Sequence, residues 1–319
     1  MIVVSNTDKT LHICYATDDN FADLTCQSIY SIIRRKDPTT EIVFHVLGDR
    51  LTNPHIFDVF RNLDHVGIIV TLIDGKQFMQ GQLSKVAPAY ATYLRFLIPL
   101  LPEMKDVKRA LWLDGDVFAR KDLFNMFHYD LQGYPLGLAK DAVGVMCKGV
   151  VPWPEPEYFH RDYYCNCGVI LMDLDKLRHS NIIRGWMDAV ARVGETQEND
   201  QHIVNRLNHY DICLLPPTFN FSYHNLIRIP KPMNRYVGRW NVYYGTHYGS
   251  LDEIIRTSYV WHFHEELEDH KKYFPLLKLI LESFENDWRE FQKTRIVRPW
   301  TPEDDKEFYI DCKSWFDTH

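Results

Sequence analysis

Short apolar runs and helix-like stretches alternate along the first half of the chain. The apolar runs at 11–16, 66–73 and 109–113 are typical of buried strands, and each ends at a polar turn. The stretch at 21–34 predicts a helix with Asn20 as its N-cap. Further strands are expected at 41–47, 136–139, 169–172 and 259–263, and further helices at 53–63, 89–97 and 200–207. This rhythm predicts an α/β fold in which helices cover a mostly parallel sheet.

The apolar pattern changes in the second half of the chain. Beyond residue 178 the alternation becomes irregular, and large apolar residues then recur at helical spacing between Tyr273 and Phe291. The chain is therefore predicted to have two parts, a main domain at 1–265 and a small helical C-terminal extension at 266–319.

Composition and charge narrow the class of protein. Of the 319 residues, 45% are hydrophobic and 25% charged, which is typical of a folded globular chain. The net charge of −7 argues against a protein that binds nucleic acid. The sequence has no apolar run long enough to span a membrane, and its polar first ten residues do not resemble a signal peptide. Seven scattered cysteines indicate reduced thiols, so we expect a cytoplasmic location.

Two polar turns follow predicted strands, at 17–20 and 114–116. Parallel sheets bind ligands beyond the carboxyl ends of their strands, so both turns are candidate sites. Asp114 and Asp116 are separated only by Gly115, and two close carboxylates favour a hard divalent cation such as Mg²⁺ or Mn²⁺. An added imidazole ligand favours Mn²⁺. The alternative is an ordinary solvated Asp-Gly turn.

Six short segments strengthen this interpretation when they are taken together and in order. They are LHICYATDDNF at 11–21, YLR at 93–95, WLDGD at 112–116, YCNCGV at 164–169, DQ at 200–201 and WHF at 261–263. This set resembles the family 8 retaining nucleotide-sugar glycosyltransferases, especially the bacterial lipopolysaccharide galactosyl- and glucosyltransferases, with glycogenin more distant. The resemblance implies a GT-A fold with a Rossmann-like sheet, a UDP-hexose donor and Mn²⁺.

The resemblance also implies the metal ligands. They are Asp114, Asp116 and His262, with Mn²⁺ as the ion and Mg²⁺ as the alternative. His264 shares a strand face with His262 and is the second candidate for the imidazole ligand. A histidine packed in the core is the other interpretation of His262.

Roles in substrate binding and catalysis follow from the same resemblance. The implied substrate-binding residues are Ala16, Thr17, Asp18 and Asn20 at the nucleotide, Asn166 and Gly168 at the donor sugar, and Asp141 near the acceptor. Among the implied catalytic residues, Arg95 provides fixed positive charge beside the diphosphate and Asp200 binds sugar hydroxyls. Gln201 lies beneath the reacting face of the sugar. Because an amide is a poor nucleophile, we expect attack on the same face through a short-lived ion pair.

The expected reaction moves galactose or glucose from UDP-galactose or UDP-glucose to a hydroxyl of an oligosaccharide or glycolipid. Lipopolysaccharide or another cell-surface saccharide is the expected acceptor, with at most peripheral contact at the inner face of a membrane. The glycine and spaced lysine that the family has after its histidine are absent from 262–273, where Lys271 or Lys272 is a possible substitute. This departure leaves a catalytically impaired UDP-sugar-binding or regulatory protein as one alternative. A self-glucosylating, glycogenin-like initiator is a separate alternative.

Overall fold

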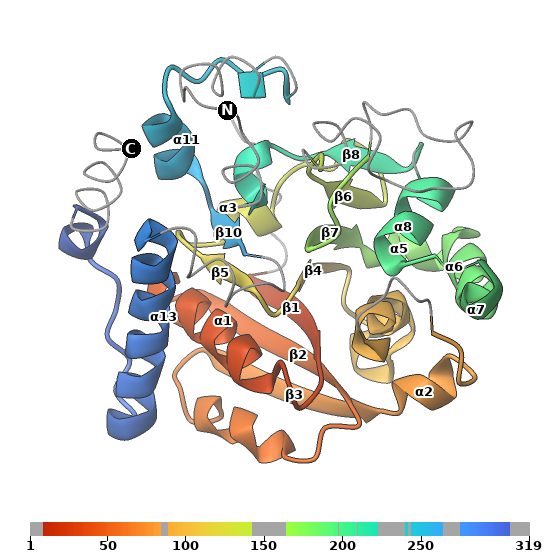
Figure 1. Cartoon of the computed structure of the whole chain (residues 1–319), viewed down its shortest axis with the longest axis horizontal. Helices are drawn as coiled ribbons and strands as arrows, with labels where there is room; N and C mark the ends of the chain where they lie inside the picture. Colours follow the sequence, from red (N-terminus) through yellow and green to blue (C-terminus); the bar gives the residue numbers. More distant parts are fainter. Residues whose placement is uncertain are drawn as a thin grey trace.

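The computed structural model describes residues 9–83, 89–141, 164–196, 198–208, 210–222, 240–241, 244–263 and 275–306. Its centre is a seven-stranded sheet in the order β3-β2-β1-β4-β7-β6-β8 (Figure 1). These strands are β1 (Thr10–Thr17), β2 (Glu41–Asp49), β3 (Val66–Ile73), β4 (Arg109–Leu113), β6 (Leu136–Leu138), β7 (Val169–Asp173) and β8 (Ile212–Leu214).

The sheet is mostly parallel, as predicted. Strand β1 runs parallel to β2 and β4, β2 parallel to β3, and β6 parallel to β8. Strand β7 alone is reversed, and it is antiparallel to both β4 and β6. Because of this reversal, the start of β7 lies beside the end of β4, with Leu113 paired to Val169. Residues before β7 therefore share an edge of the sheet with residues that follow β4.

A second, three-stranded sheet has the order β5-β10-β9. It consists of β5 (Val117–Ala119), β9 (Phe221–Ser222) and β10 (Val260–His262). Strand β10 is antiparallel to β5 and parallel to β9. Since β5 begins four residues after β4 ends, the turn at 114–116 joins the two sheets. The strand expected at 259–263 is thus present, but it belongs to this small sheet.

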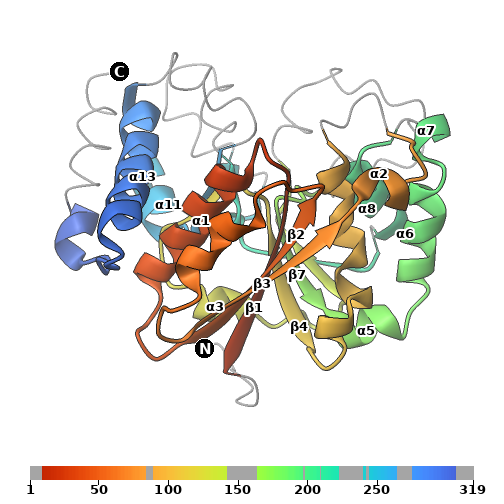
Figure 2. The ribbon, with the colours of Figure 1, turned by 90° about the horizontal axis from the view of Figure 1, so that it is seen from below.

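Helices cover both faces of the large sheet. On one side α1 (Ala22–Arg35) and α13 (Pro275–Thr294) lie together, and α6 (Ile182–Val190) and α8 (Asp200–Asn208) lie on the other (Figure 2). Shorter helices are α2 (Gly75–Phe78), α3 (Phe124–Phe127), α5 (Leu174–Arg178), α7 (Val193–Thr196) and α11 (Leu251–Thr257). Turns of 3₁₀ helix are η1 (Pro54–Phe60), η2 (Tyr90–Leu100), η3 (Pro102–Met104) and η6 (Pro217–Phe219).

Two helices expected from the sequence are 3₁₀ rather than α. They are η1, expected at 53–63, and η2, expected at 89–97. A proline opens η1, and Pro99 lies inside η2, where it cannot donate the backbone bond of an α-helix.

The predicted N-cap of the first helix is also wrong. Helix α1 begins at Ala22 after Phe21, and no side chain caps it from that position. The Asp18 carboxylate accepts the backbone N–H groups of Asn20 (2.9 Å) and Phe21 (3.1 Å) instead. A side chain that bonds two and three residues ahead satisfies these amides before the helix starts, which leaves Asn20 without a capping role.

Two hydrophobic cores lie on opposite faces of the large sheet. Successive residues of β1 alternate between them, with Ile13 in the core under α1 and Cys14 in the core under η2, α6 and α8. Helix α13 contributes Trp288 and Phe291 to the first core, where Phe291 stacks on Tyr30 at 4.6 Å between ring centroids. The predicted boundary at 265 lies outside the described residues.

Three arginines hold the segment that follows α13. Trp300 lies under the guanidinium of Arg35, with 3.9 Å between Cζ and the ring centroid, and Arg34 and Arg120 approach the same ring at 5.0 and 5.7 Å. Arg35 Cζ also lies 5.2 Å from the ring centroid of Phe284 on α13. Cation–π contacts of this kind stabilise a buried guanidinium.

Among the described residues, no helix is both long and apolar enough to cross a membrane.

Candidate active site

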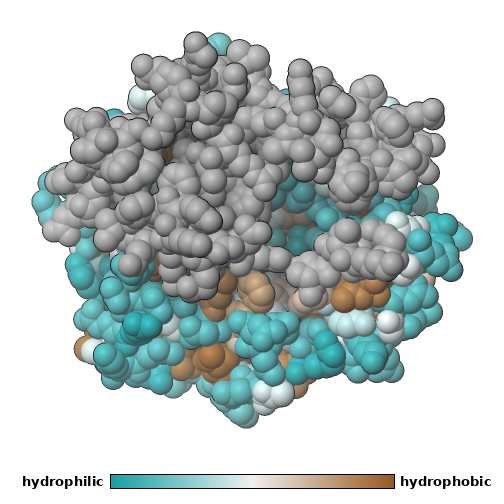
Figure 3. Space-filling view, viewed as in Figure 1, coloured by the Kyte–Doolittle hydropathy of each residue, from teal (hydrophilic) through white to brown (hydrophobic). Residues whose placement is uncertain are grey.

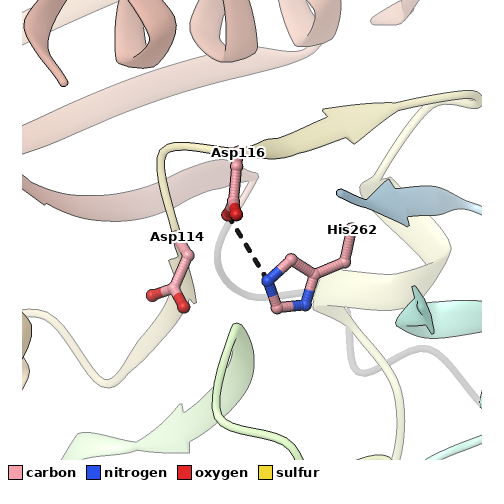
Figure 4. Close-up of side chains that lie close together, drawn as sticks. All are labelled: Asp114, Asp116 and His262. Carbon is pink, nitrogen blue, oxygen red and sulfur yellow. Dashed lines mark ion pairs between the residues drawn. The ribbon is translucent and has the colours of Figure 1, made fainter. Parts of the chain in front are cut away.

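The predicted metal ligands come together where the two sheets meet (Figure 4). Asp114 follows β4, Asp116 precedes β5, and His262 is the last residue of β10. In the antiparallel pair His262 lies opposite Val117, and the Phe263 N–H donates to the Asp116 carbonyl at 3.1 Å. The register of β10 on β5 therefore brings a histidine from residue 262 to the turn at 114–116.

The size and chemistry of this cluster fit a divalent cation. One side-chain ligand atom from each of Asp114, Asp116 and His262 lies within 4.8 Å of the other two. An octahedral Mg²⁺ with bonds of about 2.1 Å spans about 4.2 Å between opposite ligands, so small movements suffice to hold such an ion. Two carboxylates and one imidazole suit Mn²⁺ as well as Mg²⁺. The alternative ligand, His264, lies outside the described residues.

The imidazole of His262 is buried against the carboxylates. Its Nε2 lies 3.4 Å from Asp116 Oδ1, and both side chains are almost fully buried. Burial acts to lower the pKa of His262, but the Asp116 carboxylate, with Asp114 and Asp141 further away, outweighs it, and the pKa is raised. A cation bound here would neutralise the negative charge of these carboxylates.

A glycine allows the ring of His262 to occupy this place. A Cβ atom on Gly168 would lie 2.5 Å from Nδ1 and 2.8 Å from Nε2 of the imidazole, and closer still to Cε1. The backbone of Gly168 is fixed in turn, because its carbonyl accepts the Asp114 N–H at 2.9 Å. The close approach of backbone and ring thus explains why residue 168 is a glycine, and its predicted contact with the donor sugar stays a prediction.

Arg95 joins the metal cluster to the start of α8. It lies on η2 and is buried, with Nη2 3.0 Å from Asp114 Oδ1 and 2.9 Å from Asp200 Oδ2. Its Nη1 donates to the Cys167 carbonyl at 2.6 Å. Burial acts to lower the pKa of Arg95, but Asp114 and Asp200 outweigh it and the pKa is raised. For Asp200, burial raises the pKa more than Arg95 lowers it.

A chain of amides continues from α8 into the site. Gln201 accepts the Cys167 N–H at Oε1 (3.0 Å) and donates from Nε2 to Asp141 Oδ2 (3.0 Å). Asn166 Nδ2 lies 3.5 Å from the same Asp141 oxygen, and Asn166 Oδ1 accepts the Gly168 N–H at 2.9 Å. The structure thus brings Gln201 and Asn166, predicted at the donor sugar, into contact with Asp141, predicted near the acceptor, although the three come from separate segments.

A cavity extends from the metal cluster towards the end of β1. Hydrophilic residues lie in a recess over this part of the sheet (Figure 3). The residues that line the cavity come from the end of β1, the start of η2 and the metal turn: Ala16, Thr17, Asp18, Asn20, Phe21, Ala89, Ala91, Thr92, Arg95, Trp112, Asp114, Gly115 and Asp116. All four residues predicted at the nucleotide are among them. A Cβ on Gly115 would lie 2.7 Å from Thr25 Oγ1, so the metal turn sits directly on α1.

Two functional positions were missed from the sequence. Trp112 donates from Nε1 to Asp114 Oδ1 at 2.8 Å, so this oxygen accepts both Trp112 and Arg95. Asn220, between η6 and β9, contacts both His262 and Asn166. Trp112 lies two residues before Asp114, so its position next to the metal motif could have marked it as a site residue. No local pattern marks Asn220. Lys271 and Lys272, the possible substitutes for the missing lysine, lie outside the described part of the chain.

Comparison with known proteins decides the family, because residues 12–264 match the model of Glycosyl transferase family 8. The chain belongs to this family. It is 24% identical to the lipopolysaccharide 1,2-glucosyltransferase of Escherichia coli K12, over 68% of this chain and 64% of that protein. A Haemophilus influenzae protein named as a glycosyltransferase is 23% identical over 81% of this chain and 84% of its own.

The solved structures agree with this assignment. The galactosyltransferase LgtC, in complex with donor and acceptor sugar analogues, is 25% identical with a TM-score of 0.59, over 81% of this chain and 88% of that chain. The glycosyltransferase GlyE of Streptococcus pneumoniae TIGR4 has a TM-score of 0.59 at 16% identity, over 92% and 65% of the two chains. The family 8 resemblance and the GT-A fold predicted from the sequence are confirmed.

Proposed function

We propose that this family 8 glycosyltransferase moves galactose or glucose from a UDP-sugar to a hydroxyl of a glycan, with retention of configuration and with Mn²⁺ held by Asp114, Asp116 and His262. The observation that carries the proposal is Arg95, whose buried guanidinium bonds both a metal-site carboxylate and Asp200. One fixed cation thereby lies between the place for a diphosphate and the place for a sugar.

The donor is expected to lie along the cavity, with its nucleotide at the end of β1. Asp18 uses Oδ1 to hold the backbone of its own turn, and its carboxylate lines the cavity. We propose that the other oxygen accepts the uracil N–H, with Ala16, Thr17 and Asn20 around the nucleotide. When bound, Mn²⁺ would neutralise charge on the leaving diphosphate. Arg95 adds a positive charge that needs no reorganisation during the reaction.

We propose that the sugar lies against Asp200, Gln201 and Asn166. Asp200 is suited to accept sugar hydroxyls, and Gln201 presents a neutral amide whose Oε1 is already bonded to a backbone N–H. Such an amide is a poor nucleophile, unlike the carboxylate of a retaining glycosidase. The bond from C1 to the diphosphate oxygen breaks, the acceptor oxygen bonds to C1 on the same face, and its proton passes to the departing phosphate.

Relatives indicate the class of acceptor. One curated relative is a lipopolysaccharide 1,2-glucosyltransferase, and one similar structure is a galactosyltransferase bound to sugar analogues. Together they support an oligosaccharide or glycolipid acceptor, such as lipopolysaccharide or another cell-surface saccharide. A glycolipid acceptor would place the reaction at the inner face of a membrane. Asp141, bonded to Gln201, is the residue that we propose to lie nearest the acceptor.

The test is UDP release from a panel of UDP-sugars with Mn²⁺, with and without oligosaccharide acceptors. Acceptor-stimulated release from UDP-galactose or UDP-glucose supports the proposal and identifies the sugar. Asp116→Ala should abolish release and weaken UDP binding, whereas Asp58→Ala, a carboxylate that bonds Arg61 on η1, should leave both unchanged. Full activity of Asp116→Ala would contradict the metal assignment, and a covalent sugar adduct on Asp200 or Gln201 would contradict same-face attack.

A second candidate function is that of a UDP-sugar-binding protein without transfer activity. It is supported by the absence of the family's glycine and lysine from 262–273. Tight binding of a UDP-sugar with no release under any condition would support that candidate. A glycogenin-like initiator would instead gain mass in steps of one hexose without an added acceptor. The same panel, followed by mass spectrometry of the intact protein, separates these outcomes.

A further inference from the structure

We propose that Asn220 is a positioning residue that fixes the proton of His262 on Nδ1 and so presents the lone pair of Nε2 to the metal. The inference rests on the proposed metal site but goes beyond its ligands. Asn220 Oδ1 lies 3.2 Å from His262 Nδ1, and Asn220 Nδ2 lies 2.7 Å from Asn166 Oδ1. Asn220 is itself buried, with 5% of its surface exposed.

The orientation of each amide follows from a backbone group. The Gly168 N–H can only donate, so the Asn166 atom that it meets at 2.9 Å is the oxygen Oδ1. The Asn220 atom at 2.7 Å from that oxygen must then be a donor, the Nδ2 group. The remaining atom of the Asn220 amide, which faces His262, is therefore the acceptor Oδ1.

The same reasoning reaches the imidazole. A neutral histidine has one N–H, and both ring nitrogens face an oxygen acceptor. The Asn220 carbonyl, 3.2 Å from Nδ1, is closer than the Asp116 carboxylate, 3.4 Å from Nε2, and that carboxylate would bind the cation, so we assign the N–H to Nδ1. The other nitrogen, Nε2, faces Asp116 Oδ1 at 3.4 Å and belongs to the metal cluster. Partners of this kind set the tautomer and ring orientation of metal-binding histidines, and their loss commonly costs about 10- to 100-fold in metal affinity.

The chain of contacts also links the metal site to the proposed sugar site. From His262 it passes through Asn220 and Asn166 to Asp141, and then to Gln201. Two members of the path are held by neighbouring backbone groups, Asn166 by the N–H of Gly168 and Gln201 by the N–H of Cys167. Asn220 is thus the link through which one short segment before β7 orients a ligand on β10.

The direct test is the tautomer of His262 in metal-free protein labelled with ¹⁵N-histidine. Two-bond ¹H–¹⁵N spectra at alkaline pH, where the ring is neutral, distinguish the tautomers, and His262→Gln identifies the signal. We expect the Nδ1–H form in the wild type and a substantial Nε2–H population in Asn220→Leu. An Nε2–H form in the wild type, or an unchanged tautomer in Asn220→Leu, would overturn the proposal.

The affinity for Mn²⁺, measured from the electron paramagnetic resonance signal of free Mn²⁺, is the second measurement. We expect Asn220→Leu to weaken binding about 10-fold or more. Asn220→Asp keeps an acceptor at Nδ1, although it loses the donor to Asn166 Oδ1, and it should retain the Nδ1–H tautomer. If Asn220→Leu does not fold, the wild-type spectrum and the spectrum of Asn220→Asp still test the role of Asn220. Loss of the Nδ1–H form in Asn220→Asp would overturn the proposal.

A matched control is Asn208→Leu. This buried amide accepts Trp186 Nε1 at 2.7 Å within the core under α6, and in the part of the chain that the structure describes its side chain has no hydrogen bond to a site residue. It should lower stability and leave the His262 tautomer and the Mn²⁺ affinity unchanged; an equal loss of affinity in this control would overturn the assignment. If the wild type neither binds Mn²⁺ nor transfers sugar, the proposed function fails, and the tautomer spectra still decide the role of Asn220.

Discussion

Gly168→Ala should damage the metal site without touching a ligand. The new Cβ would lie 2.5 Å from His262 Nδ1 and closer still to Cε1, whereas ordinary contacts begin at 3.4 Å, so the ring and the backbone must separate by at least 0.9 Å (3.4 − 2.5). The backbone cannot yield easily, since Gly168 bonds Asp114 through its carbonyl and Asn166 through its N–H. Metal–ligand distances tolerate only about 0.2 Å of displacement.

The expected loss follows from that comparison. A ring displaced by several times the tolerance no longer contributes a ligand, and we expect Mn²⁺ affinity to fall about 10-fold or more, equivalent to about 1.4 kcal/mol. The assay is titration of metal-free protein with Mn²⁺, followed by electron paramagnetic resonance. Transfer of sugar should fall in parallel at limiting Mn²⁺ and recover in part at high Mn²⁺.

The matched control is Gly185→Ala in α6. There a Cβ would meet only Leu207 Cδ1, at 3.7 Å, and alanine in a helix interior should stabilise the protein by about 0.5–1 kcal/mol. Its Mn²⁺ affinity should equal that of the wild type. Wild-type Mn²⁺ affinity in Gly168→Ala would refute the reasoning, because it would mean that the imidazole can move without leaving the site or does not bind the ion.

Three further predictions concern other parts of the molecule. Arg95→Lys should lower kcat about 100-fold in steady-state assays, because an ammonium group cannot bond the Cys167 carbonyl as Nη1 does while also holding Asp114 and Asp200 as Nη2 does; a wild-type kcat would contradict this role. Trp300→Ala should lower the free energy of unfolding in urea by about 2 kcal/mol, since it removes the ring under Arg35, and leave transfer unchanged; an unchanged urea midpoint would refute it. Burial, and then the charge of His12, lowers the pKa of His45 from 6.5 to about 4, so the unfolded state binds a proton that the folded state does not, and stability falls as the pH drops through that range. His45→Gln should remove up to about 3 kcal/mol of this dependence in urea titrations at several pH values, and a curve parallel to the wild type would contradict it.

The sequence predicted those parts of the site that depend on local patterns. Apolar runs that end in polar turns mark strand ends, and for this reason the sequence predicts the turns at 17–20 and 114–116 as candidate sites. In the structure, residues of both turns line the cavity. The capping prediction failed at Asn20 because several short polar residues in one turn compete for the same backbone amides, and the structure shows that Asp18 binds them.

Asn220 was not predictable for a different reason. Its partners lie 42 and 54 residues away in the chain, and they reach it only because β9 and β10 pair beside the start of β7. Nothing in the sequence near Asn220 carries that information. The same holds for the proton on His262, which is set by a glycine N–H two amides away.

The reversed direction of β7 has a consequence for how this sheet tolerates change. In a wholly parallel sheet, each loop that reaches the ligand edge must cross back over a helix before the next strand. Here the chain leaves β6 and enters β7 at one edge, and Asp141 N–H bonds the Tyr164 carbonyl at 2.8 Å, next to the bridge between Lys140 and Cys165. The two ends of the intervening stretch are therefore fastened to each other. Changes in the length or sequence of 142–163 should therefore leave the register of β6 on β7 unchanged.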